Sequence, residues 1–475
     1  MSIHWADLAA EVSGELPPEA RVAFPPEVIA EAGTAAAEPE LPARDETAVP
    51  FLTVALPGTR ELDQAILIER SGQGYRVRCA IADITAFVRP GGELDAESLR
   101  RGQAISPLGG GSDAPGHRSL LYPGQIALDA ASLLPDTVRP AFVWDIQLDP
   151  DGEGTSVEVY RAMVSCTGRL DHQQVQDALG RGTSDERLTL LREVGQRRAA
   201  MERGRGGASL SIPQRQLSKG EDGRCVLSLR PPPDAQDWTV QISLMVGMAA
   251  AELMLHAEVG ILRTMPEPEH DVIQRFRRQA LALGVRWPAE TLYGELLRSL
   301  DRANPRHLAL MQEAASLFRG AGAGYSFFDG GVPEVTWHAA VAAPYAHVTA
   351  PLRRVVDRFG LVVCESICRD VPVPDWARRG LPLVPGIMTT SDALADSAER
   401  AGADAVMAAT LRDRAGETFH GLVVDVSPTG GLVQLTDPLI LVPAEGECQA
   451  GTEVTLRLIE AEAVGRTVRF QVLGV

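Results

Sequence analysis

Lysine is almost absent from this chain of 475 residues, because its 45 basic residues include a single lysine, Lys219. Acidic residues outnumber basic ones by 63 to 45, which gives a net charge of −18 at pH 7. Proteins that coat nucleic acid without choosing a site carry a broad excess of positive charge, so that class is excluded. A local basic groove inside an acidic protein is still compatible with this balance. The arginines that are present bind phosphate through a planar fork of N–H groups.

The chain also lacks long apolar runs and paired cysteines. No run approaches the ~20 apolar residues of a membrane-spanning helix, and residues 1–18 lack a basic start followed by an apolar core. None of the six cysteines forms a Cys-x-x-Cys pair. Disulfide frameworks and cysteine-based zinc sites are therefore not expected. We expect a protein of the reducing cytoplasm, without a membrane partner.

What is present is the composition of a globular protein, with 45% hydrophobic and 23% charged residues. Residues 1–50 are rich in Ala, Pro and Glu and predict a helical or extended strap. From Phe51 onward, β-branched runs broken by turn signals predict strands. After about residue 170, apolar residues at three- and four-residue spacing predict helices, and the apolar run 242–255 predicts one that is buried on all sides.

The last sixty residues return to strands. Five short β runs separated by glycine turns fit a small oligonucleotide-binding (OB) barrel. From Gly416 to Val475 the chain has eight acids and three arginines, so this module alone is not expected to hold RNA by charge.

The first candidate for chemistry is the segment Pro57 to Ile66. A Pro-Gly turn precedes Glu61 and Asp63, which are two residues apart and so lie on one face of an extended chain. Carboxylates held in this way suit a hard divalent cation, which takes oxygen ligands from protein, water and substrate phosphate. The alternative is an ordinary solvated turn.

The second candidate is the segment Pro344 to Asp370, in which Thr349 is predicted to cap a helix. The first turns of this helix carry three arginines, Arg353, Arg354 and Arg358. Guanidinium groups beside the unpaired N–H groups of a helix N-terminus form a seat for phosphate. The alternative is that these arginines pair with Asp357 on the surface.

These segments resemble the catalytic domain of the ribonuclease II/ribonuclease R family, the RNB domain. The likeness runs from about residue 51 to 400 and is carried in order by FLTVALPGTRELDQAILIER, YRVRCAIADITAFVRPGGELDAESLRRGQ, ASLL, RGGASL and HVTAPLRRVVDRF. The sequence as a whole is similar to a shorter branch of this family from high-GC bacteria. The resemblance implies an α+β fold with a strap over 1–50, an RNB catalytic domain of strands surrounded by helices over 51–410, and an OB-type RNA-binding barrel over 411–475. It also implies that the N-terminal cold-shock barrels of longer members are absent.

The function that the resemblance implies is metal-dependent 3′→5′ exoribonuclease activity on single-stranded RNA, releasing nucleoside 5′-monophosphates. Magnesium, or else manganese, is the expected cofactor, and a monomer is expected. By the family's motifs, Glu61 and Asp63 match the second and third of four metal-binding aspartates. Arg353 matches the arginine that steadies the scissile phosphate, and Glu399 falls where the family has a second catalytic acid. Further RNA contacts are expected from Arg354, Arg358 and Tyr122.

Only Asp63 keeps the family's aspartate: Glu61 is a longer but usable carboxylate, and the other two of the four metal positions carry no carboxylate. Ala55 stands at the first and offers no ligand, whereas Gln64 stands at the fourth and offers an amide oxygen. The aromatic residue that clamps RNA bases would fall near Ser106, so Tyr122 or His117 would have to stack on a base instead, unless both are ordinary loop residues. These departures favour a second hypothesis, an RNA-binding protein that keeps the RNB fold without the chemistry. A small-molecule enzyme of unrelated fold is a third.

Overall fold

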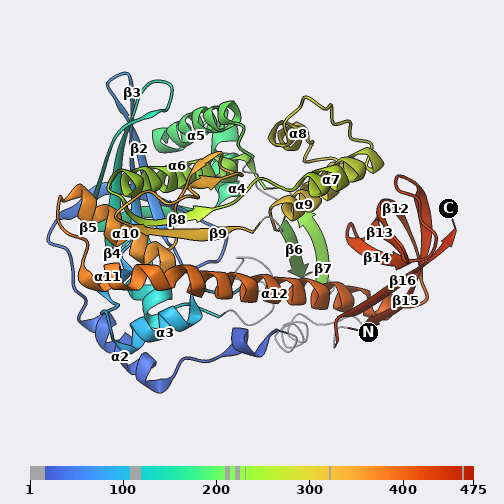
Figure 1. Ribbon diagram of the computed structural model, residues 1–475, viewed down its shortest axis with the longest axis horizontal. Coiled ribbons are helices and arrows are strands. Elements are labelled where there is room, and N and C mark those ends of the chain that lie inside the picture. Colours follow the sequence, from blue (N-terminus) through green and yellow to red (C-terminus); the bar gives the residue numbers. More distant parts are fainter. Residues whose placement is uncertain are drawn as a thin grey trace.

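The computed structural model describes residues 16–106, 119–183, 185–208, 214–219, 225–230, 232–319, 322–462 and 465–474. Within these ranges the chain forms two closed five-stranded β-barrels, joined and covered by helices (Figure 1). The first barrel forms one side of the larger body, with the β2–β3 hairpin (residues 64–82) projecting from it, and the second barrel forms the C-terminal end of the molecule. The predicted α+β fold class is confirmed.

The first barrel contains the strands predicted from Phe51 onward. Its order is β1-β2-β3-β4-β5, with β1 Asp45–Val54, β2 Gln64–Ser71, β3 Gly74–Ala82, β4 Val138–Leu148 and β5 Gly154–Leu170. Neighbouring strands are antiparallel except β1 and β5, which pair in parallel and close the barrel. Because β1 begins at Asp45, the strap predicted over 1–50 ends earlier than expected. Its described part contains η1 (Pro18–Arg21) and α2 (Pro26–Ala37).

Helix α6 (Asp234–His256) runs through the middle of the larger body (Figure 1). By length and composition it is apolar enough to cross a membrane, but 56% of its most apolar window is buried inside the protein. Ile242, Val246 and Ala250 are part of the same hydrophobic core as the first barrel. This packing makes α6 a core helix, but it is not buried on all sides as the apolar run 242–255 predicts, because Leu244 and Met248 are only partly buried and Glu252 is exposed.

The other helices of the larger body pack around this core. They are α3 (Glu93–Arg101), α4 (His172–Gly180), α5 (Glu186–Arg205), α10 (Val355–Cys368), α11 (Asp375–Gly380) and α12 (Val384–Leu411), with short turns η2 (Ile84–Ala86), η3 (Ile126–Ala130) and η4 (Leu381–Leu383). Three two-stranded ribbons complete it: β6 (Gln214–Lys219) with β7 (Cys225–Arg230), β8 (Val259–Thr264) with β9 (Gly324–Asp329), and β10 (Trp337–His338) with β11 (Ala343–Pro344).

Helix α10 begins later than predicted. Arg354, not Thr349, is its N-cap, with an extended backbone at φ −136° and ψ 129°. The reason is the Asp357 side chain, which accepts hydrogen bonds from the Ala350 amide at 2.6 Å and from the Arg354 guanidinium, and so holds residues 350–353 in turns. The apolar residues of this helix, among them Val355, Val356 and Phe359, are buried.

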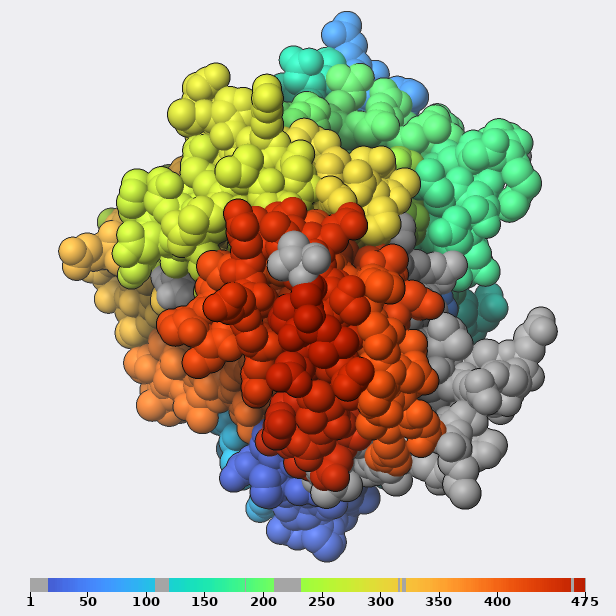
Figure 2. Space-filling model, turned by 90° about the vertical axis from the view of Figure 1, so that its right-hand side faces the viewer, coloured from blue at the N-terminus to red at the C-terminus, as the bar shows by residue number. Residues whose placement is uncertain are grey.

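The second barrel is closed in the order β12-β13-β14-β16-β15. Its strands are β12 (Thr418–Ser427), β13 (Gly430–Leu435), β14 (Leu441–Glu445), β15 (Glu453–Glu462) and β16 (Thr467–Gly474), and η5 (Arg412–Arg414) leads into it from α12. Figure 2 shows this barrel in orange and red on the face turned to the viewer, against the region of α7 (His270–Ala282), α8 (Tyr293–Ser299) and α9 (Pro305–Arg319). Leu422 and Val424 point out of the barrel into a core shared with α7–α9, whereas Val423 points inward.

Candidate active site

The candidate site lies where β1 ends and β2 begins, at one mouth of the first barrel. The chain leaves β1 through Leu56-Pro57-Gly58-Thr59, in which Gly58 has φ +73° and the Thr59 amide donates to the Leu56 carbonyl at 3.4 Å. Proline at the second position and a left-handed glycine at the third are the requirements of a type II turn. The Pro-Gly signal of the sequence therefore forms the predicted turn.

The residues after this turn are fastened to the loop that follows η3. The Leu62 amide donates to the Ser132 hydroxyl at 3.0 Å, and the Leu133 amide donates to the Leu62 carbonyl at 3.0 Å. Leu62 itself is buried in the first core. Because side chains alternate along an extended segment, Glu61 and Asp63 lie on the side opposite Leu62. Both carboxylates are buried, at 5% exposure each.

Asp63 meets the segment that precedes α10, nearly three hundred positions along the chain. The Leu352 amide donates to Oδ1 at 2.9 Å, and Arg353 Nε donates to Oδ2 at 2.8 Å. The family resemblance assigns Asp63 to the metal and Arg353 to the scissile phosphate of one site, and the structure brings the two side chains together. Burial raises the pKa of the Asp63 carboxyl, while the Arg353 guanidinium and the Leu352 amide act to lower it. The charge of Asp63 therefore depends on what pairs with it.

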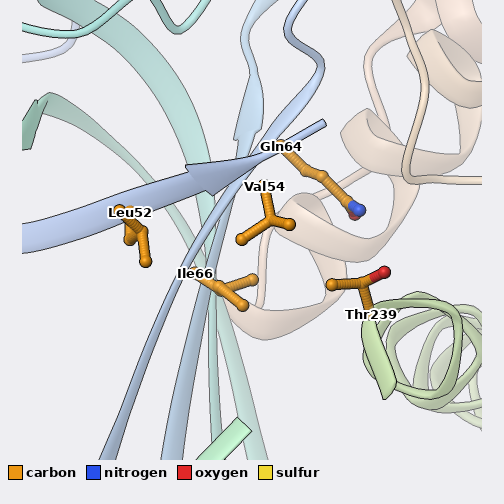
Figure 3. A pocket seen from close by; sticks show the side chains of 5 residues that line it. All are labelled: Leu52, Val54, Gln64, Ile66 and Thr239. Atoms are coloured by element: carbon orange, nitrogen blue, oxygen red, sulfur yellow. The ribbon is translucent and has the colours of Figure 1, made fainter. Parts of the chain in front are cut away.

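Gln64 lies on the other face of the strand from Asp63. Its side chain extends toward α6 and lines a small cavity of about 10 Å³ with Leu52, Val54, Ile66 and Thr239 (Figure 3). The amide oxygen of Gln64 accepts a hydrogen bond from the Ser243 hydroxyl at 3.0 Å. Successive side chains of a strand point to opposite faces, so Gln64 is not brought to the carboxylate of Asp63, and the expectation of a metal ligand at this position is not supported.

Two of the three arginines expected to contact RNA are engaged in the interior. Arg354 donates from Nε to Asp357 Oδ2 at 2.8 Å. Arg358 is fully buried, donates to Asp95 at 2.6 Å and lies over the Trp376 ring at 4.6 Å. As a correction to the sequence prediction, Arg358 has no surface to offer RNA. Arg353 is the exposed member of the three, with 52% of its side chain accessible.

The expected stacking residue Tyr122 is fully buried as well, and burial raises its pKa to about 12. Its ring is therefore out of reach of an RNA base, which corrects the second part of that prediction. The other candidate ring, His117, lies outside the described residues. The segment carrying Ser106 does reach the site, because the Ala104 amide donates to the Arg353 carbonyl at 2.8 Å.

Glu399 lies on an exposed face of α12, and the structure places it in no hydrogen bond or ion pair within the described residues.

A different acid of the same helix reaches toward the site. Asp392 accepts from Gln103 Nε2 at 2.9 Å and from Arg263 at 2.9 Å. Sequence reasoning missed Asp392, because its partners lie 289 and 129 positions away and no local motif marks it. Asp83 is fully buried and paired with Arg161, which gives it a structural role.

The donor set for a divalent cation at this site is small. Among the described residues there is no group of three or more His, Cys, Asp or Glu side chains arranged to hold a metal ion. Ala55 offers no side-chain ligand, which leaves Glu61 and Asp63. Magnesium in nucleotide enzymes is commonly held by one or two carboxylates together with waters and substrate phosphate. The residues therefore fit a cation that is completed by RNA phosphate, and they do not fit a cage made by the protein alone.

Comparison with known proteins agrees with this architecture. Residues 43–361 match the model of the RNB domain, and residues 417–473 match that of the RNase II-type exonuclease C-terminal S1 domain. Ribonuclease R of Escherichia coli is 24% identical over 425 residues, which cover 82% of this chain and 50% of that protein. Exoribonuclease 2 of Vibrio cholerae is 30% identical over 149 residues, covering 31% of this chain and 21% of that protein. The chain thus spans about half the length of ribonuclease R.

Solved structures share the fold at lower identity. Mycoplasma genitalium RNase R in complex with ribose methylated single-stranded RNA superposes with a TM-score of 0.81 at 17% identity, covering 98% of this chain and 78% of that one. Yeast Ssd1, described as a pseudonuclease, superposes with a TM-score of 0.68 at 16% identity, covering 89% of this chain and 54% of that one. With the RNB match extending over more than half of its length, the chain belongs to the RNB-domain exoribonuclease family.

Proposed function

We propose that the protein is a 3′→5′ exoribonuclease that binds the end of single-stranded RNA and hydrolyses it to nucleoside 5′-monophosphates with the help of a divalent cation. The observation that carries this proposal is the meeting of Asp63, Leu352 and Arg353 at the mouth of the first barrel. A buried carboxylate beside an exposed guanidinium offers one group for a cation and another for a phosphate.

The roles within the chain follow from this geometry. Arg353, half exposed, binds the phosphate of the terminal nucleotide. The Leu352 amide holds Asp63 in place, and Glu61, which lies two residues earlier and is also buried, is the second carboxylate. When bound, the cation supplies charge stabilisation at the phosphoryl oxygens and a more acidic water. We further propose magnesium as the physiological ion, a monomeric state and a cytoplasmic location.

The direct test is the release of nucleotides from a 5′-labelled single-stranded oligoribonucleotide, with magnesium and with a chelator. The wild type is expected to shorten the RNA only when magnesium is present. Asp63→Asn is expected to lower the rate by at least about a hundredfold, because a cation ligand at the reacting phosphate is lost, while RNA affinity measured by fluorescence anisotropy changes little. Glu399→Gln, assayed in parallel, tests whether this exposed acid takes part.

Asp151→Asn is the matched control, since Asp151 lies in the exposed β4–β5 turn at the opposite mouth of the barrel. It is expected to behave as the wild type. A wild-type protein that binds the oligonucleotide but releases no nucleotide with magnesium or manganese contradicts the proposal.

A second candidate function is RNA binding without hydrolysis. Ala55 favours it, because one of the family's metal-binding positions carries no donor at all. The fold also occurs in a protein described as a pseudonuclease. Ala55→Asp separates the two functions: a large gain in rate from an inactive wild type indicates a site that has lost its chemistry, whereas an active wild type with no gain indicates a site that is already competent.

A further inference from the structure

We propose that RNA binding moves the Arg353 guanidinium from Asp63 to the terminal phosphate, and that Asp63 accepts a divalent cation only after this exchange. The inference rests on the proposed function and adds an order to it: RNA binds first and the cation second. It follows from how the two oxygens of Asp63 are used in the protein without RNA.

Both carboxylate oxygens of Asp63 are occupied. Oδ1 accepts from the Leu352 amide at 2.9 Å and Oδ2 from Arg353 Nε at 2.8 Å, and the side chain is only 4% exposed. A cation that approached Oδ2 would lie within a few ångströms of a guanidinium that carries the same sign of charge. At that distance the repulsion offsets a large part of what the cation gains from the carboxylate, and the guanidinium already occupies one lone pair of Oδ2. The guanidinium and the cation therefore compete for Asp63, and the cation binds tightly only when the guanidinium has left.

The Arg353 side chain can leave its partner Asp63, unlike the side chains of Arg354 and Arg358, which stay with theirs. Its backbone is fixed on both sides, since its amide donates to the Ala350 carbonyl at 3.0 Å and its carbonyl accepts from the Ala104 amide at 2.8 Å. Its side chain is 52% exposed and forms its ion pair with Asp63 alone among the described residues. Arg354 and Arg358 are held by interior carboxylates, with side-chain exposures of 23% and 0%. Of these three, only Arg353 can swing while its Cα stays in place.

Before and after the exchange, each charged group of the site has a partner of opposite charge. Before RNA binds, the guanidinium neutralises the buried carboxylate. After RNA binds, the guanidinium pairs with phosphate, for which its planar fork is well suited, and the cation pairs with the carboxylate. A cation without RNA would leave Arg353 unpaired beside it. Because the Leu352 amide stays on Oδ1, the exchange frees Oδ2, so Asp63 contributes a single oxygen to the cation.

The experiment measures cation binding itself, by titrating Mn²⁺ and following its free signal by electron paramagnetic resonance. The probe RNA is a short single-stranded oligonucleotide with 2′-O-methyl riboses, and its own Mn²⁺ binding is measured without protein. We expect wild-type affinity for Mn²⁺ to increase at least about tenfold when the probe is bound. Arg353→Ala is expected to bind Mn²⁺ without RNA about tenfold more tightly than the wild type does, because the competing guanidinium is gone.

Arg60→Ala is the matched control. Arg60 is exposed, lies three residues before Asp63 and, like Arg353, carries one positive charge, but among the described residues it forms no hydrogen bond or ion pair with Asp63. Without RNA its removal is expected to change Mn²⁺ affinity by no more than about twofold, as for exposed charges in general. If Arg353→Ala and Arg60→Ala change the affinity equally, competition at Asp63 is refuted.

The comparison of wild type with and without RNA needs no variant, so a variant that fails to fold does not remove the test. Equal Mn²⁺ affinity in the two conditions overturns the exchange. Failure of the proposed function looks different: Mn²⁺ then binds in an RNA-dependent way, yet unmodified RNA is bound and never shortened. Nucleotide release together with RNA-independent Mn²⁺ binding refutes the exchange alone.

Discussion

The arginines before and within α10 differ in whether an interior carboxylate already binds the side chain. This difference decides which of them can bind phosphate. Arg358 is an extreme case, because its guanidinium is completely buried against Asp95 and over Trp376. Removing one partner of a buried ion pair leaves the other charged and unsolvated. Arg358 therefore supports the fold around the site and does not serve RNA binding.

Arg358→Ala is expected to lower the free energy of unfolding by about 3–5 kcal/mol, because Asp95 is left without its partner. Urea denaturation followed by circular dichroism measures this. Arg100→Ala is the control: Arg100 pairs with Glu97 on α3 but is 51% exposed, and its loss is expected to cost less than about 1 kcal/mol. Similar costs for the two variants would mean that the buried pair contributes no more than a surface one.

The central pair of the site was predictable from the sequence, and its surroundings were not. Family motifs at Asp63 and Arg353 predict that they meet, and they do. Sequence spacing does not show that Gln64 points to α6, since the facing of a strand residue depends on partners far along the chain. It also does not show that Tyr122 is buried, because an aromatic ring in a loop can equally well pack inward or stand in solvent.

Among the helices, α6 positions the site through a close contact at one glycine. A Cβ on Gly247 would lie 2.1 Å from the Tyr345 ring and 2.7 Å from the Ala346 carbonyl oxygen. The Gly247 carbonyl also accepts from the Ala346 amide at 3.0 Å. This contact seats the start of the segment that leads to Leu352 and Arg353, so the packing of α6 and the geometry of the site are linked.

Gly247→Ala is expected to destabilise the protein by about 1–3 kcal/mol, as overpacking does, and to lower nucleotide release by displacing residues 345–353. Gly33→Ala is the matched control, because Gly33 is exposed in α2 and a Cβ there meets nothing within 4 Å. It is expected to raise stability by up to about 1 kcal/mol through helix propensity. Thermal unfolding and the nucleotide-release assay check both. A Gly247→Ala protein as stable and active as the wild type would show that the contact is easily relaxed.

Helices and strands whose apolar residues recur at a regular spacing were predictable from the sequence, but the residues at which they begin and end were not. The helices α4 to α7 occur where apolar spacing predicts them. The start of α10 was misplaced at Thr349, because the Asp357 side chain competes for the Ala350 amide and delays the helix. The start of β1 was missed, because its partner for closing the barrel is β5, more than a hundred residues later. Local sequence carries no record of either interaction.

At the scale of the whole molecule, the C-terminal barrel packs against α7–α9 through a buried interface and is not attached by its linker alone. Leu422 and Val424 are buried against α7–α9, and Arg275 on α7 pairs with Asp425 at 2.6 Å. The barrel is acidic overall, so an apolar contact of this kind is needed to fix its position.

Leu422→Asp is expected to undock the barrel, since burying a carboxylate in an apolar contact costs several kcal/mol. Calorimetry should then resolve two unfolding transitions, and amides of the barrel should exchange faster. Val426→Asp on the same strand is the control, because Val426 is 50% exposed, and it is expected to unfold as the wild type does. A single unchanged transition in Leu422→Asp would mean that the interface does not couple the two bodies.

Helix α12 ties the two ends of the molecule together. Its 28 residues extend about 42 Å. Near one end Asp392 holds Gln103, whose neighbour Ala104 is bonded to Arg353, and at the other end Ala405 to Leu411 insert into the core of the C-terminal barrel (Figure 1). Such a rod acts as a lever. A displacement of the C-terminal barrel would therefore be transmitted along α12 to the backbone beside Arg353 as a small tilt.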